Sequence, residues 1–131
     1  MTWTVTHNSK LQIIEVVYTG ITSGEDLQES TSKAIAMTKE FGISEVLVEI
    51  TDITLDVTTM DIFKLPAHQY RTEQLDYRTH VALILPCREK ERQDALFYET
   101  VCLNRGWLVR TFETRDESTA WLKGQLLSTN K

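Results

Sequence analysis

Aspartates and threonines are concentrated in the middle of the sequence, and side chains of these types can take part in catalysis or binding. Asp52, Asp56 and Asp61 flank the neighbouring threonines Thr58 and Thr59. Carboxylates that follow a parallel strand can bind Mg²⁺, so these acids are candidates for an enzyme site. Turns and helix starts favour the same residue types, because their side chains bond to free backbone groups there. The preferred interpretation is a strand-to-helix turn in which Thr58 or Thr59 caps the next helix.

Cys87 is the other residue that could react. It precedes a predicted helix and adjoins Arg88, and both features can lower the pKa of a thiol. If the protein is an enzyme, Cys87 and the three acids are its candidate catalytic residues. The second cysteine, Cys102, would lie roughly 22 Å away if the intervening segment is helical. A disulfide needs Cα atoms within about 7 Å, so both are predicted to be free thiols in a reducing compartment.

The usual catalytic signatures are missing from the sequence. It has no Gly-rich phosphate loop, no GxSxG elbow, no CxxC pair and no HExxH helix. The histidines His7, His68 and His80 are scattered along the chain, without the convergent spacing of metal ligands. We therefore expect no metal site and no cofactor, and a protein that binds a partner rather than one that catalyses a reaction.

The helix expected after the threonines, over residues 59–74, carries apolar side chains on one side: Met60, Phe63, Ala67 and Tyr70. Pro66 lies inside it and predicts a kink or break near Leu65, because proline clashes with the preceding turn. A break there could let the helix tilt and open a pocket for a small apolar ligand or a lipid. The alternative is ordinary packing of this stripe against the core, which is the commoner use of such a pattern.

The surrounding pattern predicts the elements that position these residues. Two β-rich segments at 3–7 and 11–19 form a hairpin around the turn Asn8-Ser9-Lys10, and Gly20 is expected to end the second strand. Alternating helices and strands follow. The expected ranges are a helix at 24–41, a strand at 45–51, a connection at 52–57, the helix at 59–74, a strand at 79–85, a helix at 88–104, a strand at 107–112 and a helix at 116–127.

This order, β-β-α-β-α-β-α-β-α, predicts an α/β fold with a mixed, mostly parallel five-stranded sheet and four helices. The length of 131 residues suits one domain over 1–131 with one core. The expected core residues are Ile14, Val16, Leu47, Val48, Ile50, Ala82, Ile84, Val109 and Phe112. The charge run at 88–92 alternates in sign, which is typical of the solvated first turns of a helix.

Composition narrows the class of partner. The net charge is −5, which lacks the excess of positive charge that nucleic-acid binding requires, so no nucleic acid is expected. No stretch is long and apolar enough to cross a membrane. No basic region followed by an apolar run opens the chain, which predicts a cytoplasmic protein. The first strand should lie at a sheet edge and present unpaired backbone groups, with Trp3 as a candidate contact, which suggests a homodimer.

Three segments resemble a known family. "VVYTGIT" leads from a strand into the first helix, "VLVEITDITLDVTTMDI" joins a buried strand to the next helix, and "VRTFETRDESTAWL" closes the chain with a strand, a turn and a helix. This pattern resembles the STAS domains, especially the stand-alone SpoIIAA-like proteins. The resemblance implies the same α/β fold and a regulatory module that binds a protein partner. A similarity of fold to Sec14-type lipid carriers implies the apolar ligand as a second role.

In the anti-sigma factor antagonists of this family the middle loop reads Asp-Ser-Ser-Gly, and its first serine is phosphorylated. The resemblance places Thr58 at that serine and Thr59 at the next. Val57 stands where the family has aspartate, with Asp56 one position earlier, and Met60 replaces the glycine. We therefore predict a non-enzymatic binding or regulatory module with Thr58 as a phosphorylation candidate. The candidate binding residues are Asp52, Asp56, Thr58, Thr59, Met60, Phe63 and Tyr70.

Overall fold

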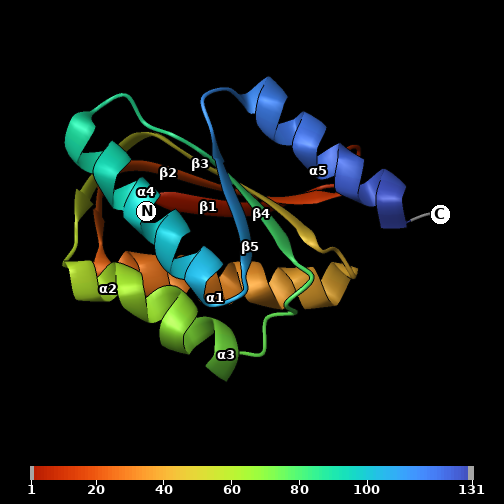
Figure 1. The fold of residues 1–131 in the computed structure, drawn as a ribbon, viewed down its shortest axis with the longest axis horizontal. Coiled ribbons are helices and arrows are strands. Elements are labelled where there is room, and N and C mark those ends of the chain that lie inside the picture. Colours follow the sequence, from red (N-terminus) through yellow and green to blue (C-terminus); the bar gives the residue numbers. More distant parts are fainter. Residues whose placement is uncertain (1, 130–131) are drawn as a thin grey trace.

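The chain folds as a five-stranded mixed sheet with helices on both faces (Figure 1). The computed structural model describes the backbone of residues 2–129 and the side chains of residues 2–125. The elements are β1 (Trp3–Asn8), β2 (Ile13–Ser23), α1 (Gly24–Phe41), β3 (Glu45–Asp56), α2 (Thr59–Lys64), η1 (Leu65–Gln69), α3 (Tyr70–Thr72), β4 (His80–Ile84), α4 (Glu89–Asn104), β5 (Leu108–Phe112) and α5 (Arg115–Thr129). Since α2, η1 and α3 are continuous, the predicted element order is confirmed.

The strands lie in sequence order, β1-β2-β3-β4-β5. β1 pairs antiparallel with β2, and the three remaining pairs are parallel. The sheet is therefore mixed and mostly parallel, as predicted, and β1 lies at an edge. Trp3 is buried within the single chain, which does not support it as a contact for self-association, and the homodimer stays a prediction.

β2 and β3 are longer than the sequence suggested. Gly20 does not end β2: the ladder shifts register between Val17 and Thr19, Gly20 adopts a φ of 69°, and the strand continues to Ser23. The left-handed backbone at Gly20 is available to glycine at little steric cost. β3 likewise continues to Asp56, so the connection expected at 52–57 is mostly strand.

The predicted break at Pro66 is a widened helical turn. η1 is a π-helical segment in which the Tyr70 N–H bonds to the Leu65 carbonyl, five residues back. Pro66 has no N–H to give to a regular helical ladder, which favours such an adjustment. The buried side of this helix consists of Ile62, Leu65, Pro66 and Tyr70. The predicted apolar face is therefore wrong at Met60, which is 54% exposed.

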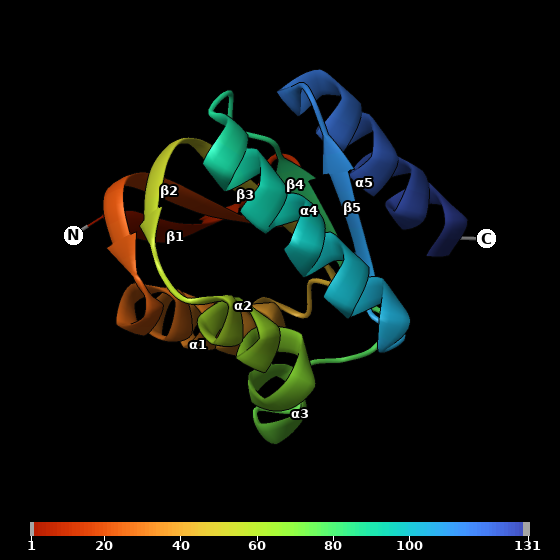
Figure 2. The same ribbon diagram turned by 60° about the vertical axis from the view of Figure 1, so that its left-hand side comes forward.

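The two faces of the sheet are covered unequally (Figure 1, Figure 2). α1, the α2–α3 helix and α4 lie on one face, and α5 alone lies on the other. Of the predicted core residues, Val48 and Phe112 are half-buried and the rest are buried. No helix among residues 2–129 has the length and apolar character needed to span a membrane.

Candidate functional site

Thr58 stands at the junction of β3 with α2 and caps the helix. Its hydroxyl accepts a hydrogen bond from the Asp61 N–H at 3.1 Å, and its own N–H donates to Asp61 Oδ2 at 2.9 Å. This reciprocal pair is a capping box, which satisfies free N–H groups of the first turn. Thr58 and Thr59 are both exposed, so a hydroxyl faces solvent at this end of the sheet.

The start of α1 lies against the same corner. Ser23 caps α1 through the same arrangement with Asp26, and β2 pairs Ser23 with Asp56. A Cβ at Gly24 would lie only 2.7 Å from Cγ of Asp61. Because Asp61 is held by its capping box, glycine at position 24 lets the two helix starts approach each other. The ends of β2 and β3 and the starts of α1 and α2 therefore form one rigid corner.

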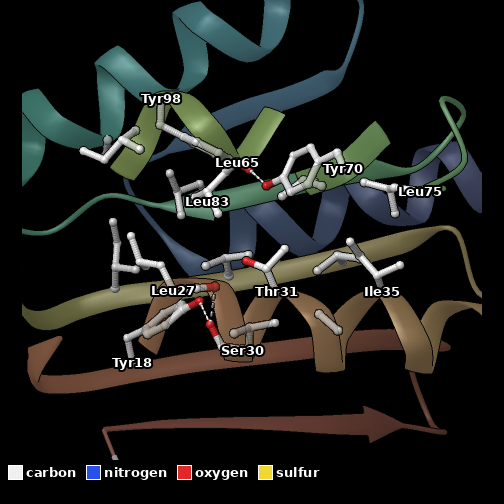
Figure 3. A pocket seen from close by; sticks show the side chains of 18 of the residues that line it. Tyr18, Leu27, Ser30, Thr31, Ile35, Leu65, Tyr70, Leu75, Leu83 and Tyr98 are labelled. Atoms are coloured by element: carbon white, nitrogen blue, oxygen red, sulfur yellow. Dashed lines mark hydrogen bonds between the residues drawn. The ribbon is translucent and has the colours of Figure 1, made fainter. Parts of the chain in front are cut away.

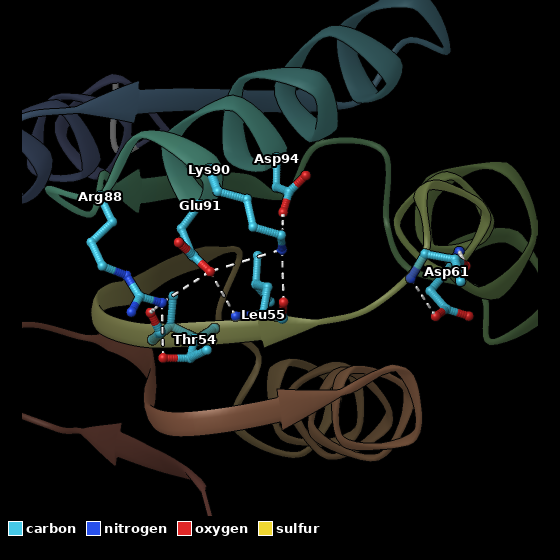
Figure 4. Close-up of polar contacts among 9 residues, drawn as sticks. Thr54, Leu55, Asp61, Arg88, Lys90, Glu91 and Asp94 are labelled. Atoms are coloured by element: carbon cyan, nitrogen blue, oxygen red, sulfur yellow. Dashed lines mark hydrogen bonds and ion pairs between the residues drawn. The ribbon is translucent and has the colours of Figure 1, made fainter.

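The end of β3 projects beyond β4, and α4 holds its free edge. β4 pairs only with Glu45–Glu49. Farther along, Glu91 Oε2 accepts the Leu55 N–H at 3.0 Å and Lys90 Nζ donates to the Leu55 carbonyl at 2.7 Å (Figure 4). Arg88 reaches the Thr54 hydroxyl at 2.8 Å. Side chains of α4 thus bond the backbone groups that a neighbouring strand would otherwise pair.

Glu91 is the residue that the charge-run interpretation missed. Its side chain is 3% exposed, so the expectation of a wholly solvated run at 88–92 is wrong. Burial opposes its ionisation, but the Leu55 N–H and the Arg88 guanidinium, 3.0 Å away, outweigh burial and lower the pKa of Glu91. An ionised, paired carboxylate therefore fixes α4 to β3. The alternating charges at 88–92 did not indicate that Glu91 would be buried, because its burial results from the packing of α4 against β3.

The predicted binding residues divide into two groups. Asp52, Asp56, Thr58, Thr59 and Met60 are exposed along the end of β3 and the start of α2. Phe63 instead lies 4.9 Å from the Arg105 guanidinium, which sits over its ring, and Tyr70 is buried. One set therefore belongs to a surface and the other to the packing of the α2–α3 helix.

The residues of the enzyme hypothesis do not form a cluster. Both cysteines are free thiols, as predicted; Cys102 is buried and Cys87 is exposed. Asp61 is used in the capping box, and no hydrogen bond joins Cys87 to any of the three acids. His7 stacks on Phe41, and His80 packs edge-on against Trp121. Among residues 2–129 no three His, Cys, Asp or Glu side chains come together as they would to hold a metal.

An apolar cavity of about 120 Å³ lies between the sheet and the helices that cover its larger core. Its walls come from β2, β3 and β4, from α1 and α4, and from the helix that contains Pro66; they include Val16, Ile53, Leu65, Leu83 and Ala95. Figure 3 shows α1 on one side of this space and the Pro66 helix on the other.

Two pairs of hydroxyls border the cavity on opposite sides (Figure 3). Tyr18 bonds to Ser30 on the α1 side, and Tyr70 bonds to Tyr98 on the other. Burial raises the pKa of Tyr18 to about 12, and burial also raises the pKa of Tyr70 and Tyr98. All three phenols are therefore neutral at physiological pH. Of these residues, only Tyr70 was named as a binding candidate from the sequence. Tyr18 and Tyr98 could not be named, because their positions at the cavity depend on how α1 and α4 pack on the sheet.

Comparison with known proteins gives matches by structure alone. No family model and no curated protein matches the sequence. The anti-sigma factor antagonist SpoIIAA in its unphosphorylated form superposes with a TM-score of 0.55 at 9% identity, over 93% of this chain and 98% of that one. An uncharacterized DUF3478-family protein from Shewanella loihica PV-4 gives 0.56 at 15% identity, over 92% and 91%.

The chain has the SpoIIAA-like fold. The solved structure from Shewanella loihica carries that description of its own fold, and the match covers nearly the whole of both chains. The fold implied by the sequence resemblance is therefore confirmed. A shared fold does not fix a shared activity, so function has to be argued from the exposed corner and the cavity.

Proposed function

We propose that this chain is a non-enzymatic binding or regulatory module. Its partner docks on the β3–α2 surface, defined by the exposed residues Asp52, Asp56, Thr58, Thr59 and Met60. The main support is the fixed end of β3. There the side chains of Glu91 and Lys90 bond to the N–H and the carbonyl of Leu55, an arrangement referred to below as the clamp. A surface that is held rigid before binding loses little conformational entropy when a partner docks.

Charge indicates the kind of partner. Asp52 and Asp56 are both exposed, and neither carboxylate makes a hydrogen bond or ion pair with another described residue. Met60 adds a flexible apolar side chain of the kind that is used at adaptable contact surfaces. The surface therefore suits a protein with a basic face, which two uncompensated carboxylates would steer and orient.

The test is a pull-down from a lysate of the source organism with a doubly charge-reversed bait, Asp52→Lys/Asp56→Lys. A partner retained by the wild type should be lost. The matched control is Glu29→Lys/Glu40→Lys, which makes the same change of charge at two exposed positions of α1. Equal retention by both double variants, with both folded by circular dichroism, would contradict the proposed surface.

Phosphorylation of Thr58 is a further prediction within this proposal. A phosphate there would meet the free N–H groups of the helix start, which favour negative charge. Asp56 and Asp61 oppose it by like charge, whereas the structure brings the cations Arg88 and Lys90 to Thr54 and Leu55 of the same strand. Thr58→Asp should keep the cap. If Thr58→Asp folds normally yet no longer retains the partner, Thr58 acts as a switch; unchanged retention would remove that role.

Binding of a small apolar molecule is the second candidate function, and the cavity favours it. The cavity lies beneath the Pro66 helix, where the sequence suggested a pocket, although Leu65 and Tyr70 line it and Met60 and Phe63 do not. The residues that line the cavity are not those of the β3–α2 surface, although Leu55, which Glu91 and Lys90 hold at the end of β3, belongs to the cavity wall.

A further inference from the structure

The size of the cavity limits what it can hold. An apolar cavity of about 150 Å³ binds benzene or xenon, whereas sites for drug-sized ligands measure about 300–1,000 Å³. At about 120 Å³, this cavity accepts one compact ring with little adjustment of its walls. A long acyl chain is larger than this volume. The volume therefore favours a small ring over the lipid suggested by the sequence.

The hydroxyls on the α1 side limit the polarity of the occupant. Ser30 Oγ donates its proton to the Leu27 carbonyl at 3.1 Å. Either hydroxyl can donate in the bond between Ser30 and Tyr18, and when Ser30 gives its proton to Leu27 the donor is Tyr18. Both protons are then in use, while each oxygen keeps a free lone pair. The Tyr18–Ser30 pair can therefore accept a hydrogen bond from an occupant, and the Thr31 hydroxyl also lines this side of the cavity.

The wall formed by the Pro66 helix is held at one point and irregular at another. Trp107 Nε1–H donates to the Pro66 carbonyl at 3.2 Å, and the Tyr70 ring packs edge-on against Trp107 at 5.4 Å. Leu65 and Tyr70, at the two ends of the widened turn, both line the cavity. Widened turns of this kind are frequent at functional sites. The turn thus places two lining side chains while the indole fixes its position.

We propose that the cavity binds one compact apolar ring that carries a single hydrogen-bond donor, as a phenol does. The ring contacts the aliphatic side chains of β3 and β4, and its donor meets the oxygens of Tyr18 and Ser30. This inference rests on the second candidate function, since it gives the chemistry of the molecule that the cavity holds. It does not depend on the β3–α2 surface.

The test measures the melting temperature of the full chain with benzene and with phenol at matched concentrations. Both probes should raise it, by about 3–8 °C near saturation, because a ligand that binds only the folded state stabilises it. In an apolar cavity without an acceptor, phenol would bind less tightly than benzene, since its hydroxyl would be left unpaired. A shift with phenol at least as large as that with benzene therefore supports the donor requirement.

Two cavity-filling variants locate the effect. Ala34→Leu on α1 and Ala95→Leu on α4 each place a larger side chain on a lining residue, and either should abolish the shift. Using both protects the test if one variant is unstable. The matched control is Ala120→Leu, the same change at an exposed position of α5, which should keep the full shift. Methyl NMR should show phenol-induced changes at Ile53 and Leu83, which line the cavity, and none at Ile13 and Leu122 on the other face.

The outcomes separate the two levels of the proposal. If neither probe shifts the melting temperature of the wild type, or if both filled variants respond as the wild type does, the cavity is not a ligand site and the second candidate function fails. If benzene shifts it and phenol does not, the cavity binds apolar molecules but the assigned donor is wrong. Partner retention through Asp52 and Asp56 is a separate measurement and is unaffected by either result.

Discussion

The two faces of the sheet differ in how completely they are filled. On one face α5 packs Leu122 against Ile13, Leu47, Ala82 and Ile84, with Leu122 and Ala82 fully buried. On the other face three helices share a larger core and leave the cavity between them. One helix covers the first face, whereas three helices, one of them with the widened turn at Pro66, cover the second. The cavity therefore lies on the face that three helices cover.

The largest expected loss of stability comes from truncating a buried leucine, and one leucine from each face is compared. Leu122→Ala should lower the free energy of unfolding by about 4–5 kcal/mol, because it opens a new void in a filled cluster. Leu65→Ala should cost about 3 kcal/mol, since Leu65 already borders the cavity and has fewer contacts to lose. Urea denaturation at equilibrium measures both values. A cost for Leu65→Ala equal to or above that for Leu122→Ala would show that the cavity face is as tightly packed as the other.

The next effect concerns the clamp at the end of β3, on the cavity face. Glu91→Gln should cost about 1–2 kcal/mol at neutral pH, because the charge that pairs with Arg88 is lost while an amide oxygen can still accept the Leu55 N–H. The pKa of Glu91 is lowered in the folded state. Its contribution to stability is therefore present above the pKa of the unfolded chain, about 4.3, and is lost as the pH falls through the folded value.

Denaturation curves for the wild type and Glu91→Gln at a series of pH values test this sign. The difference in stability between them should shrink as the solution is acidified below about pH 4. The closest control is Glu89→Gln, an exposed acid two positions earlier on α4, which should leave the pH dependence nearly unchanged. A difference between wild type and Glu91→Gln that is constant with pH would mean that folding does not lower the pKa of Glu91.

The smallest effect should be the same on both faces. Thr58→Ala removes the cap of α2, and Thr114→Ala removes the hydroxyl that accepts the Glu117 N–H at 3.2 Å at the start of α5. Each should cost about 1 kcal/mol, because a cap is a local interaction that does not depend on packing. Thermal or urea unfolding measures both. Markedly unequal costs would mean that one of the two threonines has a role in tertiary packing as well.

Local signals predicted most of the elements. The helix expected at 24–41 matches α1, with Ser23 as its cap and Gly42 in a left-handed conformation at its end. The ends of β2 and β3 were harder to predict. Beyond Gly20 and Asp52 the two strands form backbone hydrogen bonds with each other, and neither segment taken alone indicates this pairing. The cap at Thr58 was within reach of the sequence, since hydroxyl and acid are three residues apart.

Long-range contacts decided both candidate sites. The clamp joins residues about 35 positions apart, so the sequence around Glu91 shows only alternating charge. The cavity depends on how far α1, α4 and the Pro66 helix stand from the sheet, and Tyr18 and Ser30 meet there only because α1 packs over β2. Hydrophobic periodicity and capping residues act within a few positions, and so the sequence alone determined the class of fold, the order of its elements and the exposed threonines. The tertiary structure decided which acid is buried, which side of the α2–α3 helix faces inward and where a space remains, because these follow from packing between segments that are distant in the chain.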